Sequence, residues 1–174
     1  ALPIFNPKLA YMSSQEEKSQ AASGPTMIEP SRQGKMSVSE EAHPLQEPGF
    51  LFDKHPIPMY IFDRETLAFL AVNDAALTQY GYTREEFLAL TMLDIRPPEE
   101  AERLVSREVN LHQSVEKLGR WKHLCKDGTL IDVEITAHAL DYAGRPARWV
   151  MAENITARLR AEEDVRLRAE QMAT

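Results

Sequence analysis

Two tight-turn signals divide the second half of the chain into three segments with the pattern of β-strands. Asp127-Gly128 separates Gly119–Lys126 from Thr129–Leu140, and Ala143-Gly144 separates Thr129–Leu140 from Arg145–Asn154. An Asp-Gly pair favours a short hairpin turn because both residues tolerate a positive φ. The middle segment alternates strictly, with Ile131, Val133, Ile135 and Ala137 against Asp132, Glu134, Thr136 and His138. The sequence therefore predicts three antiparallel strands in hairpin succession, with one buried face and one wet face.

Two shorter strands are predicted earlier in the chain. Met59–Phe62 and Phe69–Val72 are rich in apolar and aromatic residues, which favours strands. The polar run Asp63–Thr66 between them indicates a turn. This pair is expected to form a hairpin at the beginning of the sheet.

Between these two groups of strands the pattern is helical. Asn73 is a good N-cap for a short helix over Asp74–Tyr80. The run Thr83–Glu86 matches a capping box and opens a second helix, Arg84–Leu90. Apolar residues at helical spacing predict a longer helix over Glu99–Val115. The whole order predicts an α+β fold with one antiparallel sheet and the helices on one side of it.

The chain divides into three parts. Residues 1–47 hold five of the eleven prolines and show no apolar period after Met12, so we expect a flexible N-terminal tail. Residues 48–154 carry the predicted sheet and helices as one domain. Residues 155–174 have balanced charge and predict a C-terminal linker helix.

Composition limits the classes of function. The net charge of −7 argues against nucleic acid as a partner, because binding phosphates needs a basic face. No apolar run is long enough for a membrane span, and no signal-peptide pattern is present. A single cysteine, Cys125, allows no internal disulfide. We therefore expect a cytoplasmic protein.

Five local strings together resemble a PAS domain of the bacterial type. They are Pro58–Asp63, Val72–Ala76, Gly81–Phe87, Lys126–Thr129 and Glu153–Thr156, and they occur in the family's order and at family-like spacing. The resemblance implies a five-stranded antiparallel sheet in the order 2-1-5-4-3, flanked by short helices that cover a central pocket. It also implies that the domain senses a ligand or partner and passes its state to a C-terminal signalling helix.

The resemblance and the strand parity together nominate site residues. The pocket-lining set is Ile61, Val72, Asn73, Tyr80, Leu88, Leu104, Val109, Trp121, Val133, Ile135 and Val150. The signal-relay set is Asn154, Ile155, Thr156 and Leu159. Asn154 stands where the family usually has aspartate, so its amide can accept a hydrogen bond but supplies no charge.

The known cofactors of the family can be compared with this sequence. Light-oxygen-voltage domains need a cysteine in the stretch that corresponds to Met92–Pro97, and none is there; Cys125 is interpreted as a packed structural residue. Haem ligation is disfavoured because His112 lies near the end of its predicted helix. His138 is expected to be exposed. Non-covalent flavin, with Asn73, Trp121 and Trp149 as contacts, stays open; a small organic ligand or no ligand fits at least as well.

Catalysis and metal binding are not indicated. The chain has neither a phosphate-binding Gly-rich loop nor a Gly-x-Ser-x-Gly elbow, and no histidines or carboxylates have metal-ligand spacing. We expect a sensor module without enzymatic activity of its own.

The C-terminal helix suggests a partner and an output. With Thr156 as predicted N-cap, its apolar residues follow an irregular heptad, which predicts a weak coiled coil in a homodimer; a frayed terminal helix is the alternative. Arg168–Thr174 resembles the run that leads into the dimerisation helix of sensor histidine kinases. The leading hypothesis is the input domain of a two-component sensor histidine kinase. An input domain for a cyclic-dinucleotide synthase or hydrolase, and a ligand-free dimerisation module, remain alternatives.

Overall fold

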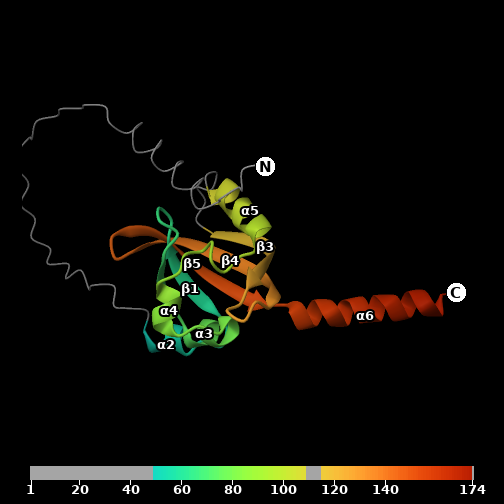
Figure 1. Cartoon of the computed structure of the whole chain (residues 1–174). Coiled ribbons are helices and arrows are strands. Elements are labelled where there is room, and N and C mark those ends of the chain that lie inside the picture. The colour runs from blue at the N-terminus through green and yellow to red at the C-terminus, as the bar shows by residue number, and fades with distance from the viewer. Residues whose placement is uncertain (1–48, 109–114, 174) are drawn as a thin grey trace, which may run out of the picture.

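The computed structural model describes residues 49–108 and 115–173 of the chain (Figure 1). Its five strands form one antiparallel sheet in the order β2-β1-β5-β4-β3, so the predicted fold class and strand order are confirmed. The elements are α2 (Phe50–Asp53), β1 (Met59–Asp63), β2 (Phe69–Val72), α3 (Asp74–Tyr80), α4 (Arg84–Leu88), α5 (Pro98–Glu108), β3 (Val115–Leu124), β4 (Leu130–Tyr142), β5 (Arg145–Asn154) and α6 (Thr156–Met172). The proposed flexible tail, residues 1–47, lies outside the described residues.

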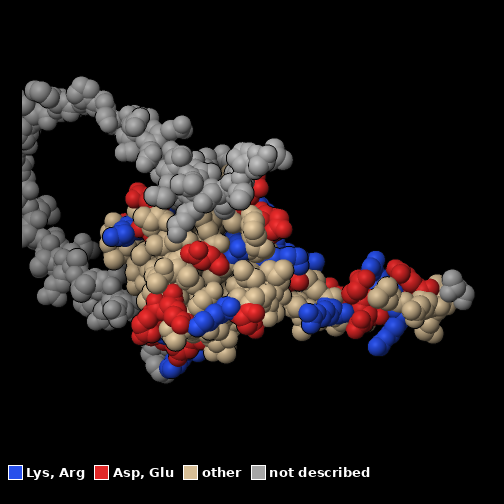
Figure 2. Space-filling view, in the orientation of Figure 1, with Lys and Arg blue, Asp and Glu red and all other residues tan. Residues whose placement is uncertain are grey.

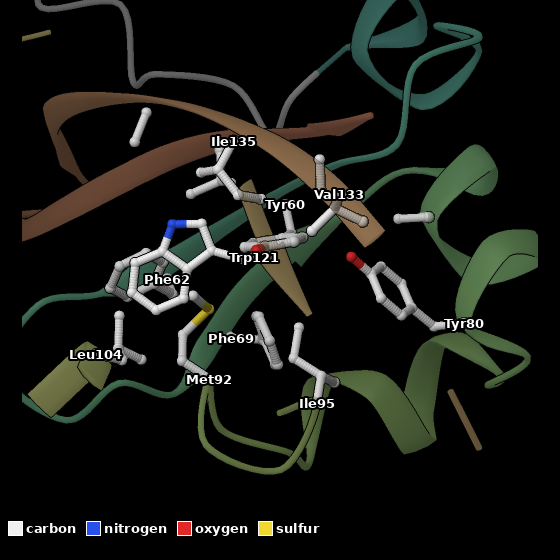
Figure 3. Packing of buried hydrophobic residues seen from close by; sticks show 14 of the residues in the cluster. Tyr60, Phe62, Phe69, Tyr80, Met92, Ile95, Leu104, Trp121, Val133 and Ile135 are labelled. Atoms are coloured by element: carbon white, nitrogen blue, oxygen red, sulfur yellow. The ribbon is translucent and has the colours of Figure 1, made fainter. Parts of the chain in front are cut away.

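Helices α3, α4 and α5 cover one face of the sheet, and the other face carries a smaller buried cluster of Ile61, Ala71 and Ala147 packed against α2. Helix α3 packs on β1, α4 on β2 and α5 on β3, while α6 leaves the domain as an extension (Figure 1). The main core lies between the sheet and these helices, and Figure 3 shows its large side chains gathered there. None of the helices in residues 49–108 and 115–173 is long and apolar enough to span a membrane.

The amide of Asn73 joins three parts of the domain. Its Oδ1 accepts hydrogen bonds from the backbone N–H groups of Met59, at 2.9 Å, and Ala76, at 3.0 Å. Its Nδ2 donates to the carbonyls of Ile57, at 2.9 Å, and His55, at 3.3 Å. Asn73 is therefore the predicted N-cap of α3, and it also fixes the start of β1 and the segment before it.

The connection between α3 and α4 follows the sequence signals closely. Gly81 ends α3 with a φ of 81°, a left-handed conformation that glycine adopts without strain. Thr83 and Glu86 form both bonds of the predicted capping box. Lys126 in the β3–β4 turn donates to both carboxylate oxygens of Glu86, at 2.8 and 2.9 Å, and ties α4 to that turn.

The region between α5 and β3 corrects the sequence prediction. The helix predicted over Glu99–Val115 is observed as Pro98–Glu108, and Val115 instead pairs with His138 as the first residue of β3. A β-bulge between Lys117 and Gly119 shifts the register within β3. The extra residue interrupts the alternation by which a strand is recognised, so the start of β3 was missed. The strand also ends earlier than predicted, at Leu124.

The substitution Asn73→Ala tests the importance of this amide. It leaves two carbonyls and two N–H groups without their partner in a buried place, so we expect a loss of about 2–4 kcal/mol in the free energy of unfolding. Denaturant unfolding followed by circular dichroism measures it. The matched control is Asn154→Ala, because exposed Asn154 accepts one hydrogen bond. Equal losses for both variants would contradict the role given to Asn73.

Candidate functional site

The structure brings most of the predicted pocket residues together. Seven of them belong to one buried cluster against the helix-covered face of the sheet: Val72, Tyr80, Leu104, Trp121, Val133, Ile135 and Val150. Figure 3 shows five of these, Tyr80, Leu104, Trp121, Val133 and Ile135, around the same centre as Tyr60 and Met92. These residues form the wall of the hydrophobic core, and their contact with a ligand stays a prediction.

Three described residues of the predicted set, Ile61, Asn73 and Leu88, are not part of this hydrophobic cluster. Ile61 lies on the opposite face of the sheet with Ala71 and Ala147, because Tyr60 and Phe62 on either side of it take the inner positions of β1. Leu88 is 37% exposed at the end of α4, since the preceding Phe87 occupies the core. In the strand, a shift of one position reverses the face, which explains Ile61; in the helix, the neighbouring Phe87 takes the core position in place of Leu88. Val109 lies outside the described residues.

The residues proposed as flavin contacts do not converge on one site. The amide of Asn73 is committed to four hydrogen bonds within the fold. Trp121 is in the core, where its Nε1 donates to the carbonyl of Leu118 at 3.1 Å. Trp149 lies on the other face of the sheet, with its ring centroid 5.7 Å from that of His138. This arrangement gives no support to the three-residue flavin site.

The remaining cysteine and histidine predictions are partly corrected. Cys125 is buried, with its thiol 3.4 Å from the carbonyl oxygen of Gln79, and burial raises its pKa, in keeping with a packed structural residue. His138 is half-buried against Trp149 instead of exposed. His112 lies outside the described residues. Within residues 49–108 and 115–173, no three His, Cys, Asp or Glu side chains are grouped as metal ligands.

A buried polar group in the core was missed by sequence reasoning. The hydroxyl of Tyr80 lies 2.7 Å from Nδ1 of His123, and both side chains are fully buried. Arg96 is 5% exposed, and its Nη1 donates to the carbonyl of Met92 at 2.8 Å. The N–H of Leu124 donates to the carbonyl of Ile95 at 2.8 Å, which fastens the Arg96 segment to the end of β3.

One sequence signal was available for part of this group. His123 is two residues after Trp121 on the same strand, so the two side chains share a face. No comparable signal exists for Arg96, because an arginine between Asp94 and a pair of prolines has the pattern of a solvated loop.

The predicted relay residues form a compact junction between β4, β5 and α6. The N–H of buried Ile155 donates to the carbonyl of Asp132 at 2.9 Å, and the N–H of Asp132 donates to Oγ1 of Thr156 at 2.9 Å. Oδ1 of Asn154 accepts from the N–H of Thr156 at 3.0 Å, so the amide makes the hydrogen bond without the charge of an aspartate. Leu159 follows with its N–H bonded to the carbonyl of Ile155 at 3.0 Å.

The structure corrects the predicted start of α6. Ile155, not Thr156, occupies the N-cap position, and no side chain caps the helix. The hydroxyl of Thr156 is instead used to bind the neighbouring strand β4.

Comparison with known families supports the fold assignment. Residues 69–152 match a family model described as PAS fold, and these residues run from the start of β2 into β5. The matched segment therefore has the PAS fold. The family resemblance inferred from the five local strings is thereby confirmed.

The PAS domain has relatives among curated proteins and solved structures. It is 26% identical over 117 residues to a methyl sulfide methyltransferase-associated sensor from Methanosarcina acetivorans, a match that covers 67% of this chain and 12% of that protein. A PAS domain of an HTR-like protein from Haloarcula marismortui aligns with a TM-score of 0.54 and 18% identity, over 60% of this chain and 86% of that one. A PAS domain from Colwellia psychrerythraea aligns with a TM-score of 0.52 and 20% identity, over 62% and 92%. At these identities the two structures show the fold alone.

Burial controls the protonation of the polar group in the PAS core. It lowers the pKa of His123 well below its usual value, and the charge of Arg96 acts in the same direction. It raises the pKa of Tyr80 well above its usual value. Both side chains are therefore neutral near pH 7, and we assign Tyr80 as the donor to Nδ1, which leaves the imidazole hydrogen on Nε2.

The low pKa of His123 makes stability depend on pH. Below about pH 6.5 the unfolded chain protonates this histidine while the folded PAS domain resists protonation. The stabilisation is therefore complete above that pH and decreases, by up to about 1.4 kcal/mol per pH unit, as the pH falls.

The variant His123→Asn isolates this contribution, because its amide oxygen can still accept from Tyr80 but does not titrate. We expect the free energy of unfolding to fall less steeply for the variant than for the natural sequence between about pH 7 and about pH 5.5. Urea titrations at several pH values measure the two slopes. Identical slopes would show that His123 titrates alike in both states.

Proposed function

We propose that this PAS domain is the sensory input module of a signal-transduction protein, and that its effector is a sensor histidine kinase. In this proposal, binding of a ligand or partner changes the sheet, and the change reaches the effector through α6. The observation that carries the proposal is the junction at Asp132, whose backbone holds both Ile155 and Thr156. A change in β4 at this residue therefore acts directly on the first turn of α6.

The form of α6 supports a role as an output element. The helix extends away from the domain, with both charge signs interspersed along it (Figure 2). Its apolar residues are unusually open to solvent: Val165 is 66% exposed and Met172 is 88% exposed. These two residues lie seven positions apart, on one face of the helix, as in a coiled coil. A second α6 in a homodimer would cover them.

The outer face of the sheet supports the same assembly. An apolar groove of about 470 Å³ lies there, between α2 and the strands, with Phe52, Ile61, Trp149 and Met151 in its lining. Apolar surface of this kind is typical of contact sites between proteins. We therefore propose a homodimer that uses the sheet surface and α6 together.

Two observations favour a kinase as the effector. The residues Arg168–Thr174 resemble the approach to a kinase dimerisation helix, and the curated relative is named as a sensor. The chain spans 12% of that relative's length, so output chemistry would lie in other parts of such a protein. We propose that this domain has no catalysis of its own. A cytoplasmic location stays a prediction.

The relay is tested by fusing the chain, through α6, to the catalytic core of a histidine kinase. The substitution Thr156→Val removes the acceptor for the Asp132 N–H, so we expect the rate of autophosphorylation to change by about threefold or more. Thr78→Val is the matched control, because Thr78 is exposed on α3. A second set of fusions carries insertions within α6. If neither Thr156→Val nor these insertions change the rate of autophosphorylation, the proposed relay is wrong.

The dimer is tested by sedimentation of the full chain and of a chain that ends at Asn154. We expect the full chain to sediment as a dimer and the shortened chain to associate more weakly, by about tenfold or more in Kd, because it lacks the apolar residues of α6. Equal association of the two chains would assign the contact to the sheet surface alone. Two monomers would contradict the homodimer.

A further inference from the structure

Arg96 places a positive charge inside the PAS core. Its side chain is 5% exposed, and among residues 49–108 and 115–173 it has no ion pair with a carboxylate. Its guanidinium carbon lies 5.4 Å from the centre of the Trp121 ring, and Nη1 bonds to the Met92 carbonyl. Nε is buried and has no hydrogen-bond partner. A buried charge without a counter-charge is destabilising, so this position needs a physical reason.

Two further buried polar atoms without hydrogen-bond partners belong to side chains near Arg96. They are the hydroxyl of Tyr60 and Nε2 of His123. Burial raises the pKa of Tyr60, and the charge of Arg96 and a side-chain contact with it act in the opposite direction. Burial lowers the pKa of His123, and the charge of Arg96 lowers it further. The Ile95–Leu124 hydrogen bond, beside His123 in sequence, places Arg96 at this end of β3 independently of those pKa shifts.

The three groups have the same hydrogen-bonding character. Arg96 Nε–H and the Tyr60 hydroxyl are donors, and Nε2 of His123 is a donor when Tyr80 donates to Nδ1. One fixed positive charge and three donors, with no carboxylate paired to them, form a site of the kind that binds an anion.

We propose that the core of this PAS domain binds a small monovalent carboxylate through Arg96, Tyr60 and His123. The proposal rests on the sensory function proposed above and names the class of its ligand. The carboxylate oxygens accept from the three donors, and the negative charge balances Arg96. His123 stays neutral in the complex and acts as a hydrogen-bond donor.

Packing and charge both limit the ligand. Aromatic rings surround the centre of the core closely, with the Phe69 and Phe87 centroids 4.4 Å apart and those of Tyr80 and Phe87 5.8 Å apart. Such packing limits any ligand at this place to few heavy atoms. A single arginine balances one negative charge, so a dianion such as sulfate would enter with an unpaired charge. The ligand is therefore of the size of formate, acetate or propionate.

The site lies close to the output junction. His123 pairs with Ile131 across the β3–β4 ladder, and Lys122 pairs with Asp132. Nζ of Lys122 also lies 3.0 Å from a carboxylate oxygen of Asp132, the residue whose backbone holds the start of α6. A carboxylate bound to His123 can therefore shift its strand partner Ile131, the residue before Asp132, which anchors α6.

The experiment is a thermal-unfolding and calorimetric titration of the full 174-residue chain with sodium acetate. Formate and propionate test size, acetamide tests the need for charge, and sodium chloride at equal ionic strength controls for general salt effects. Nitrate, a planar inorganic monoanion, and phosphate distinguish carboxylates from other oxyanions. We expect acetate to raise Tm in a saturable way, while chloride and acetamide do not.

Variants assign the effect to the proposed residues. Arg96→Met should abolish the response to acetate, and Tyr60→Phe should weaken Kd by about tenfold. Arg103→Met is the matched control, because Arg103 lies over the same Trp121 ring, 3.8 Å from its centre, but is exposed. The Arg103→Met variant should bind acetate with the same Kd as the unsubstituted chain. If Arg96→Met fails to fold, as judged by circular dichroism, the Tyr60→Phe titration decides alone.

Several outcomes would overturn the proposal. One is a Tm and heat signal that stay flat with every carboxylate up to about 50 mM, which would leave water as the partner of the buried donors. A stronger response to phosphate or nitrate than to acetate is another. Unchanged acetate binding in Tyr60→Phe is a third. Because binding is measured on the chain without an effector, a silent kinase fusion would contradict the relay and leave the site intact.

Discussion

The hydrogen bonds of one buried amide hold the PAS domain in register. Asn73 is the last residue before α3, and it also fixes the first residue of β1 and the carbonyls of His55 and Ile57. Strand β1 is paired on both sides, with β2 and with β5. A shift in the position of Asn73 would therefore disturb both the sheet, through Met59, and helix α3, through Ala76. The core residues can meet because this corner is fixed.

Much of the fold could be predicted because its signals are local. The Asp127-Gly128 turn, the Thr83–Glu86 capping box and the Asn73 cap each act within a few residues, and each is observed. The sequence predictions are wrong where a contact between distant parts of the chain determines the secondary structure. The bulge before Gly119 depends on pairing with β4, and pairing, not alternation, determines that Val115 starts a strand.

The candidate site was less predictable than the sheet. Side-chain parity placed Trp121, Val133 and Ile135 correctly in the core, but Ile61 was assigned to the wrong face. Arg96 could not be found in this way, because its burial depends on β3, which holds Ile95 through Leu124. A charged residue in a polar loop is usually solvated, and the burial of Arg96 becomes visible only with the contact between Ile95 and Leu124.

The way in which α6 is attached has a consequence for how such sequences can vary. At Asp132 both bonds to the junction use the main chain, so exchange of that side chain leaves them available. At Thr156 the bond uses a hydroxyl, which serine alone among the other small residues could supply in the same place. Amino-acid exchanges should therefore be tolerated at position 132 and restricted at position 156, even though the two residues share one hydrogen bond.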